Sequence, residues 1–161
     1  MTITWDHKSN RKHFLKHLID THNLTNIVEV GVRDGRTTFH LLEQCPHIQK
    51  YYAIDSNINL FFNDQIKQKY GEKLIAINGL SQQVHQKVPN ASCDLIFIDA
   101  DHSYPAVKQD IINYRPKLKP GGILSGHDID FPGVNQAVNE MLENYDVGPN
   151  NVWFVRDVYF V

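Results

Sequence analysis

The sequence has few cysteines, no long apolar run and almost no net charge, and each shortage excludes a class of protein. Its two cysteines, Cys45 and Cys93, are far apart and match no metal-binding spacing, so they are expected to be reduced thiols rather than part of a disulfide scaffold. No stretch of about 18 apolar residues is present, which argues against a membrane span. The formal net charge of −2 provides no basic field that would recruit nucleic acid.

The first residues, MTITWDHKSNRKHF, also lack the apolar segment of a secretory signal peptide. Together with the unpaired cysteines, this predicts a cytoplasmic protein. The 161 residues, of which 42% are hydrophobic and 21% charged, suit one ordinary globular domain. We find no repeat or linker, so a single domain is expected over residues 1–161, without a cap domain.

Short apolar runs alternate with helical patterns along the chain. The runs at residues 27–30, 51–54, 74–78 and 95–98, and a fifth that begins at Ile123, read as buried strands. Helical patterns cover residues 8–22, 36–45, 61–70, 82–88 and 134–145, and another follows Ser103. This alternation predicts an α/β fold with a mostly parallel sheet, and the β-rich end at residues 151–161 should add one or two antiparallel strands at its edge. The basic side of the first helix, which carries Arg11, is expected to be solvated or to touch an anionic partner.

The segment IVEVGVRDGRTT, residues 27–38, has the layout of a nucleotide-binding strand, glycine turn and helix. Thr37 and Thr38 could cap that helix. The pattern is E-x-G-x-x-x-G rather than the dinucleotide fingerprint G-x-G-x-x-G, and the carboxylates of Glu29 and Asp34 would repel a pyrophosphate but attract a cation. S-adenosylmethionine, which carries a sulfonium and an ammonium, therefore fits better than NAD. The alternative is an ordinary glycine turn without a ligand.

Two further stretches could hold the rest of such a cofactor. Asp55 ends the second predicted strand 20 residues after Gly35, close to the spacing at which an acid reaches ribose hydroxyls, although it could simply be a turn or helix-capping aspartate. Ser81 and Gln82 follow the third strand and offer hydrogen-bond groups for an adenine. Taken alone, these two residues are equally well explained as turn and capping residues.

Polar residues crowd the ends of the fourth and fifth predicted strands. Asp99, Asp101 and His102 follow the fourth strand, and His127 and Asp128 follow the fifth. Ligands bind at the carboxyl ends of strands in open α/β sheets, so these groups are expected to converge on one site. Either histidine could act as a base, or each could be a structural residue that holds a loop.

Taken together, these stretches resemble the class I S-adenosylmethionine-dependent methyltransferases, in particular small-molecule O-methyltransferases of the catechol and macrolide-sugar types. The resemblance covers residues 25–145 and rests on VEVGVRDG, on Asp55, on GLSQ at residues 79–82, and on FIDADHSY and KPGGILSGHD. It implies a Rossmann-like, doubly wound sheet of seven mostly parallel strands, with an antiparallel edge strand and helices on both faces.

The resemblance also implies a set of site residues. Those implied for S-adenosyl-L-methionine are Glu29, Gly31, Val32, Arg33, Gly35, Thr37, Asp55, Ser56, Gly79, Leu80, Ser81, Gln82 and Asp99. In metal-dependent members, the corresponding ligands of a Mg or Mn ion would be Asp99, His127 and Asp128. The family pair after the fifth strand is usually Asp-Asn or Asp-Asp, so His127 departs from it, and His102 stands where the catechol type has a lysine.

The expected reaction is in-line methyl transfer to a hydroxyl of a small molecule, in which His102, His127 or a metal ion assists loss of the proton. The principal alternative is a non-catalytic S-adenosylmethionine-binding or partner protein of the same fold. An NAD-dependent oxidoreductase and a nucleic-acid methyltransferase are disfavoured by the crowded glycine turn and by the near-neutral charge. Without a cap domain, the substrate pocket is expected to be small and open or to be completed by a second subunit of a homo-oligomer.

Overall fold

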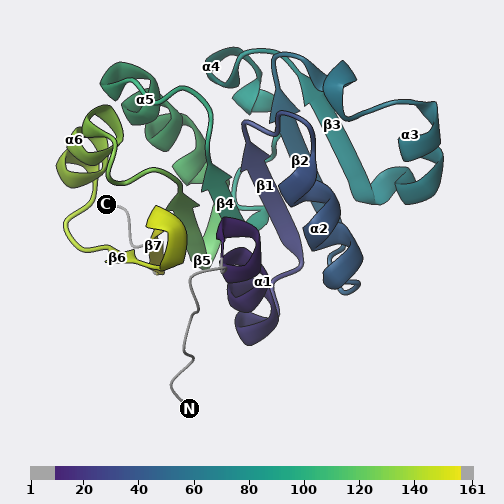
Figure 1. The fold of residues 1–161 in the computed structure, drawn as a ribbon, viewed down its shortest axis with the longest axis horizontal. Coiled ribbons are helices and arrows are strands. Elements are labelled where there is room, and N and C mark those ends of the chain that lie inside the picture. Colours follow the sequence, from purple (N-terminus) through teal and green to yellow (C-terminus); the bar gives the residue numbers. More distant parts are fainter. Residues whose placement is uncertain (1–9, 157–161) are drawn as a thin grey trace.

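A computed structural model describes residues 10–156, and these form a seven-stranded sheet with helices on both faces (Figure 1). The strands are β1 (Asn26–Val30), β2 (Lys50–Asp55), β3 (Leu74–Asn78), β4 (Cys93–Ile98), β5 (Leu118–Gly126), β6 (Asp146–Val147) and β7 (Trp153–Arg156). The helices are α1 (Arg11–His22), α2 (Arg36–Gln44), α3 (Asp64–Tyr70), α4 (Ser81–Val84), α5 (Tyr104–Tyr114) and α6 (Pro132–Met141). The predicted fold class is therefore confirmed.

The strand order is β3-β2-β1-β4-β5-β7-β6. Strands β1 to β5 pair in parallel, β7 runs antiparallel to β5, and the short β6 pairs antiparallel with β7 at the outer edge. The order reverses between β1 and β4, because the chain moves outward through β2 and β3 and then returns to β4. In doubly wound sheets this reversal leaves a crevice at the carboxyl ends of the strands.

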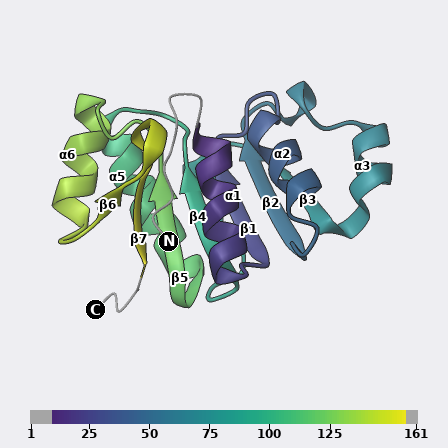
Figure 2. The same ribbon diagram turned by 60° about the horizontal axis from the view of Figure 1, so that its bottom comes forward.

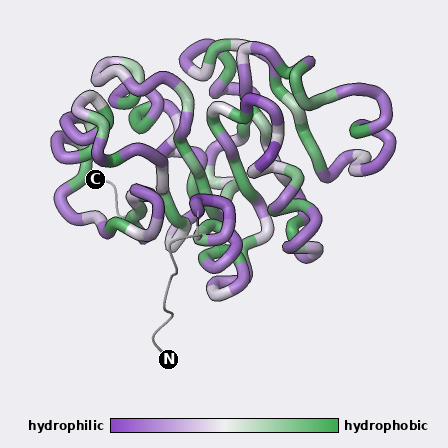
Figure 3. Tube along the Cα trace, viewed as in Figure 1, coloured by the Kyte–Doolittle hydropathy of each residue, from purple (hydrophilic) through white to green (hydrophobic). Residues whose placement is uncertain are grey.

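Two hydrophobic cores lie on the two faces of the sheet. Helices α1, α2 and α3 cover one face, and α4, α5 and α6 cover the other (Figure 2). Hydrophobic residues accordingly concentrate in the central strands, whereas the loops are mostly hydrophilic (Figure 3). Cys45 and Cys93 are free and buried, one in each core. No helix within residues 10–156 combines the length and the apolar character needed to cross a membrane.

Helix boundaries differ from the predicted ones where a local contact stops the helix. The helix expected at residues 61–70 begins only at Asp64, because the Asn63 side chain caps it and Phe61 is buried in a core. The helix expected at residues 82–88 is the short α4 followed by a 3-10 turn at His85–Lys87. Strand β7 covers the first part of the predicted β-rich end, while residues 157–161, like residues 8 and 9 of the expected first helix, lie outside the described part.

Candidate functional site

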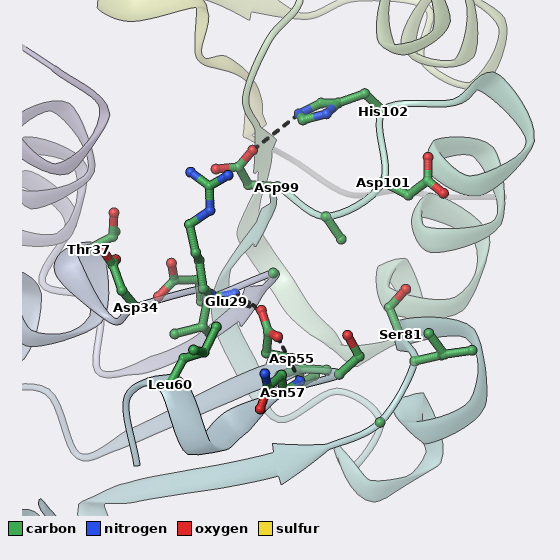
Figure 4. Close-up of a pocket in the computed structure, with 18 of the residues that line it drawn as sticks. Glu29, Asp34, Thr37, Asp55, Asn57, Leu60, Ser81, Asp99, Asp101 and His102 are labelled. Carbon is green, nitrogen blue, oxygen red and sulfur yellow. Dashed lines mark hydrogen bonds and ion pairs between the residues drawn. The ribbon is translucent and has the colours of Figure 1, made fainter.

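A pocket of about 590 Å³ opens at the carboxyl ends of β1 to β4, in the crevice where the strand order reverses (Figure 4). We call it the strand-end pocket. Its lining consists of Arg11, Glu29, Gly31, Val32, Arg33, Asp34, Arg36, Thr37, Ile54, Asp55, Ser56, Asn57, Leu60, Gly79, Leu80, Ser81, Gln82, Asp99, Ala100, Asp101, His102 and Asp128. Every residue predicted to bind the cofactor is included except Gly35. One cavity thus joins four sequence segments that local patterns could only suggest separately.

The glycine turn after β1 owes its shape to backbone contacts. Gly31 has φ +90°, and a Cβ atom there would lie 2.2 Å from the carbonyl oxygen of Asp99. A side chain at Gly31 would therefore collide with the backbone after β4. Gly35 (φ +84°) is the N-cap of α2, where a Cβ would lie 2.6 Å from the ring of Phe39. Gly35 accordingly shapes the start of the helix rather than the pocket wall.

Asp55 fastens this turn to the end of β2. Its Oδ2 accepts hydrogen bonds from the backbone N–H groups of Val32 (3.0 Å) and Arg33 (2.8 Å), and its Oδ1 accepts one from Asn57 (2.9 Å). The bonds hold Arg33 in a left-handed conformation, φ +62°, which non-glycine residues rarely adopt. A carboxylate offers about four acceptor sites, so Asp55 retains capacity for a hydroxyl donor from a ligand.

Glu29 is a buried carboxyl group in the wall of the pocket. The residue is only 3% exposed, and its Oε1 accepts hydrogen bonds from the hydroxyls of Thr38 and Tyr51, both at 2.6 Å. Burial raises the pKa of Glu29 from 4.5 to about 7, although the two hydrogen bonds oppose this shift. Thr38 was expected to cap α2, and that prediction is wrong, because its hydroxyl binds Glu29 and the N-cap is Gly35.

The part of the pocket that follows β2 and β3 has apolar side chains beside polar backbone. Leu60 and Leu80 line it and are 58% and 52% exposed, which is unusual for residues of this type. Ser81 begins α4, and the hydroxyl of Tyr114 on α5 donates to its carbonyl oxygen (2.8 Å). The GLSQ segment is therefore held from behind by α5. Exposed apolar side chains here can cover the faces of a flat ring.

Beyond the glycine turn, four side chains converge that we call the acid–histidine cluster: Asp99, His102, His127 and Asp128. The Nε2 of His102 lies 2.7 Å from Oδ2 of Asp128 and 3.6 Å from Oδ1 of Asp99 (Figure 4 labels Asp99 and His102). The Nδ1 of His127 lies 3.1 Å and 3.7 Å from the same two oxygens. Burial raises the pKa of Asp99, and the nearby guanidinium of Arg11 is the strongest opposing influence.

The two histidines have different surroundings. His127 is 10% exposed in its side chain, does not line the strand-end pocket, and uses both ring nitrogens, Nδ1 with Arg11 (3.3 Å) and Nε2 with Asn150 Oδ1 (3.0 Å). An arginine can only donate and a carboxylate can only accept, and Nδ1 of His127 lies close to both Arg11 and Oδ2 of Asp128 (3.1 Å). The side chain of His102 is 38% exposed and lines the pocket, and its Nε2 has no well-formed hydrogen bond.

A divalent cation fits the same cluster. Ligand atoms of Asp99, His102 and Asp128 lie within 4.8 Å of one another, and Nε2 of His102 is buried without a hydrogen-bond partner. Two carboxylates and one imidazole suit Mn or Zn better than Mg, which prefers oxygen ligands. The set expected from sequence contained His127 in place of His102. Asp128 also has a left-handed backbone, φ +60°, which strained functional residues often show.

Sequence reasoning did not assign a role to several residues of the pocket wall. The helix face with Arg11 was expected to be solvated or to touch an anionic partner, but no contact within the chain was foreseen; its NH1 lies 3.6 Å from Oδ2 of Asp99. No local signal identified it, because its place depends on how α1 packs on the sheet. Asn57 and Leu60 also line the pocket, and their position shortly after the ribose candidate Asp55 was the signal that could have found them.

Comparison with known proteins gives one family match in sequence. The model of a family described as "Methyltransferase domain" matches residues 28–129, from β1 through the loop after β5. The matched region includes most of the pocket lining and the whole acid–histidine cluster. None of the curated proteins matches the chain.

Several solved structures have the same fold. A provisionally assigned caffeoyl-CoA O-methyltransferase from Staphylococcus aureus superposes with a TM-score of 0.75 at 18% identity, over 98% of this chain and 85% of that one. An O-methyltransferase from Bacillus cereus in complex with SAH gives 0.71 at 16% identity, over 95% and 82%. The N-methyltransferase NodS from Bradyrhizobium japonicum gives 0.63 at 16% identity, over 91% and 94%. At these identities the likeness concerns the fold, and the acceptor atoms of the neighbours include both oxygen and nitrogen.

Proposed function

The chain belongs to the methyltransferase domain family, and from that premise we propose that it transfers the methyl group of S-adenosyl-L-methionine to a hydroxyl of a small molecule. One observation carries the proposal: the strand-end pocket runs without interruption from the GLSQ segment to the acid–histidine cluster. Such a cavity can hold a cofactor along its length and an acceptor at its end. A non-catalytic binding protein would have no use for the cluster.

The residues of the pocket suit the three parts of the cofactor. Leu60, Leu80 and the backbone after β3 provide an apolar slot with polar edges for the adenine. Asp55 has acceptor capacity for the ribose hydroxyls. Glu29 is the carboxyl group that can face a positive charge, so it is assigned to the ammonium of the methionine portion. The sulfonium then lies toward Asp99 and the cluster.

His102 is assigned as the base and His127 as a positioning residue. In the reaction, the acceptor O–H gives its proton to the imidazole ring of His102, the oxygen forms a bond to the methyl carbon, and the C–S bond breaks with its electron pair on sulfur. The products are a methyl ether, S-adenosylhomocysteine and an imidazolium, which Asp128 at 2.7 Å stabilises. Because both ring nitrogens of His127 are in use, this histidine serves to orient Asp99 and Asp128.

A divalent cation would be held by Asp99, His102 and Asp128, and it would lower the pKa of a coordinated hydroxyl. In that case His102 is a ligand and not the base. Chelation separates the two versions. Activity that survives the chelator assigns His102 as the base, whereas activity that disappears and returns with added Mn assigns the cluster to a metal.

The acceptor is proposed to be a small molecule, because the net charge of −2 provides no basic field that would recruit nucleic acid. The two free cysteines fit a reducing compartment, so a cytoplasmic location is proposed. A homo-oligomer that completes the open pocket is part of the same proposal. Light scattering with and without S-adenosylhomocysteine tests this last point.

Calorimetry with S-adenosylmethionine tests the cofactor. The expected dissociation constant is in the micromolar range, about −8 kcal/mol. Asp55→Ala should weaken binding by about 1.5–3 kcal/mol, because it removes a charged acceptor and loosens the turn. Asp64→Ala on α3, which is outside the pocket lining, is the matched control. A wild-type protein that shows no heat of binding and no methyl transfer to any hydroxyl compound in a panel would overturn the proposal.

A further inference from the structure

We propose that Arg11 is a built-in cation of the acid–histidine cluster, and that it competes with a divalent metal ion for Asp99. The inference rests on the proposed function, because it concerns the same site. It assigns to α1 a role in deciding how strongly the site holds a metal. Arg11 lies outside the region that the family model matches, because that region begins at residue 28.

Arg11 and the two histidines lie near different oxygens of the Asp99 carboxylate. The guanidinium NH1 lies 3.6 Å from Oδ2 of Asp99, whereas His102 and His127 approach Oδ1. The same NH1 lies 3.3 Å from Nδ1 of His127. One guanidinium nitrogen therefore lies close to two members of the cluster, Asp99 and His127.

The fold, and not a ligand, sets the position of this guanidinium. Arg11 is the first residue of α1, whose N-terminus is fixed by a capping box between Asn10 and His13. The helix is anchored by four buried residues in the core it shares with α2: Phe14, Leu15, Leu18 and Ile19. The arginine is thus presented to the cluster by a rigid element, which lowers the entropic cost of the contact.

The charges of the cluster require a cation. The carboxylates of Asp99 and Asp128 converge on His102. Arg11 is the fixed positive charge within reach of Asp99 among the described residues. A guanidinium remains charged at any physiological pH, so it offsets the repulsion between the two carboxylates permanently.

A divalent ion that took Asp99 as a ligand would lie close to this guanidinium. The positive charges of the ion and the guanidinium would repel strongly when close together in a partly buried site. The ion would also have to share an Asp99 carboxylate that is already contacted on its Oδ2 side. Arg11 therefore keeps the cluster assembled without metal and weakens its affinity for one.

Manganese binding to the intact protein, followed by the EPR signal of free Mn²⁺, tests this role. Arg11→Gln removes the charge but keeps hydrogen-bond donors, and it should tighten Mn²⁺ binding by at least about tenfold through loss of repulsion. Lys12→Gln removes the same charge from the next position of α1, which is outside the pocket lining, and should change the affinity by less than about twofold. Unchanged or weaker Mn²⁺ binding by Arg11→Gln would overturn the proposal.

Arg11→Lys guards against a variant that fails to fold. Arg11→Lys keeps the charge and should bind Mn²⁺ as weakly as the wild type, so tight binding by this variant would contradict the proposal. Parallel calorimetry with S-adenosylhomocysteine reports on the proposed function separately, because cofactor binding can succeed while the manganese prediction fails.

Discussion

The buried carboxyl group of Glu29 should make cofactor binding depend on pH. In the free protein its pKa is about 7, so the group is protonated over most of the acidic range. The ammonium of bound S-adenosylmethionine favours the carboxylate and should return the pKa toward its ordinary value. Binding should therefore release a proton below neutral pH, and Glu29→Gln should abolish this release.

The size of the effect follows from linkage. If the bound-state pKa is near 4.5 and the free-state pKa near 7, the affinity should rise on the order of tenfold between about pH 5.5 and about pH 7. The α-amino group of the cofactor remains protonated in this window, because its pKa is about 7.7–8.0. In the free protein, the folded state binds this proton more tightly than the unfolded chain, so the unfolding free energy should fall by about 3 kcal/mol as pH rises from 4.5 to about 7.

Calorimetry in two buffers of different ionisation enthalpy measures the protons released on binding. The wild type should release close to one proton from Glu29 near pH 6. Glu29→Gln should therefore release about one proton fewer than the wild type. Glu43→Gln, an exposed glutamate on α2, is the matched control and should behave as the wild type. The comparison with Glu29→Gln also removes the contribution of titrating histidines. Equal proton release by the wild type and Glu29→Gln would refute the assignment of Glu29 to the ammonium.

Four further substitutions have defined outcomes. Burial raises the pKa of Asp110 from 3.8 to about 6. Asp110→Asn should therefore raise the unfolding free energy at about pH 7.5 by up to about 3 kcal/mol and change it little near pH 4. A urea titration that shows no gain in stability at about pH 7.5 would contradict this. Gly126→Ala should cost about 1–3 kcal/mol in the same assay, because its Cβ would lie 2.3 Å from the buried Trp153 ring; unchanged stability would mean that the indole moves freely. In a methyl-transfer assay without metal, His102→Ala should lower turnover by about 10²–10⁴-fold and His127→Ala by clearly less, and equal losses would show that their roles are not distinct.

The predicted elements were confirmed mainly where periodicity and length agree. The strand at residues 74–78 has those bounds, and the helix that begins at Arg36 differs by one residue at its end. Errors arose at helix ends, where hydrogen bonds and burial compete with helix propensity. Thr38, for example, is of a type that favours a capping position, but the buried carboxyl group of Glu29 requires a hydrogen-bond donor. The Thr38 hydroxyl therefore points to Glu29.

The expected role of single residues was harder to predict than their location. Gly31 was identified as a site residue from its motif, and a side chain there proves to conflict with the backbone of Asp99. Asp55 was predicted to bind ribose, and in the structure it also fastens the glycine turn through two backbone N–H groups. A motif indicates which residue type occurs at a position, but it does not indicate whether packing, a hydrogen bond within the chain or a ligand requires that type.

The sequence by itself determined the fold class, the methyltransferase family and the strand ends at which polar residues gather, because these follow from periodicity and from motifs that are local in the chain. The tertiary structure decided which of those residues face one another. Arg11 meets Asp99 across 88 positions, and His102 rather than His127 opens to the pocket, because the packing of α1 and the loop with Asn150 fixes their orientation. Contacts between distant segments depend on the shapes of whole elements, and no local pattern encodes them.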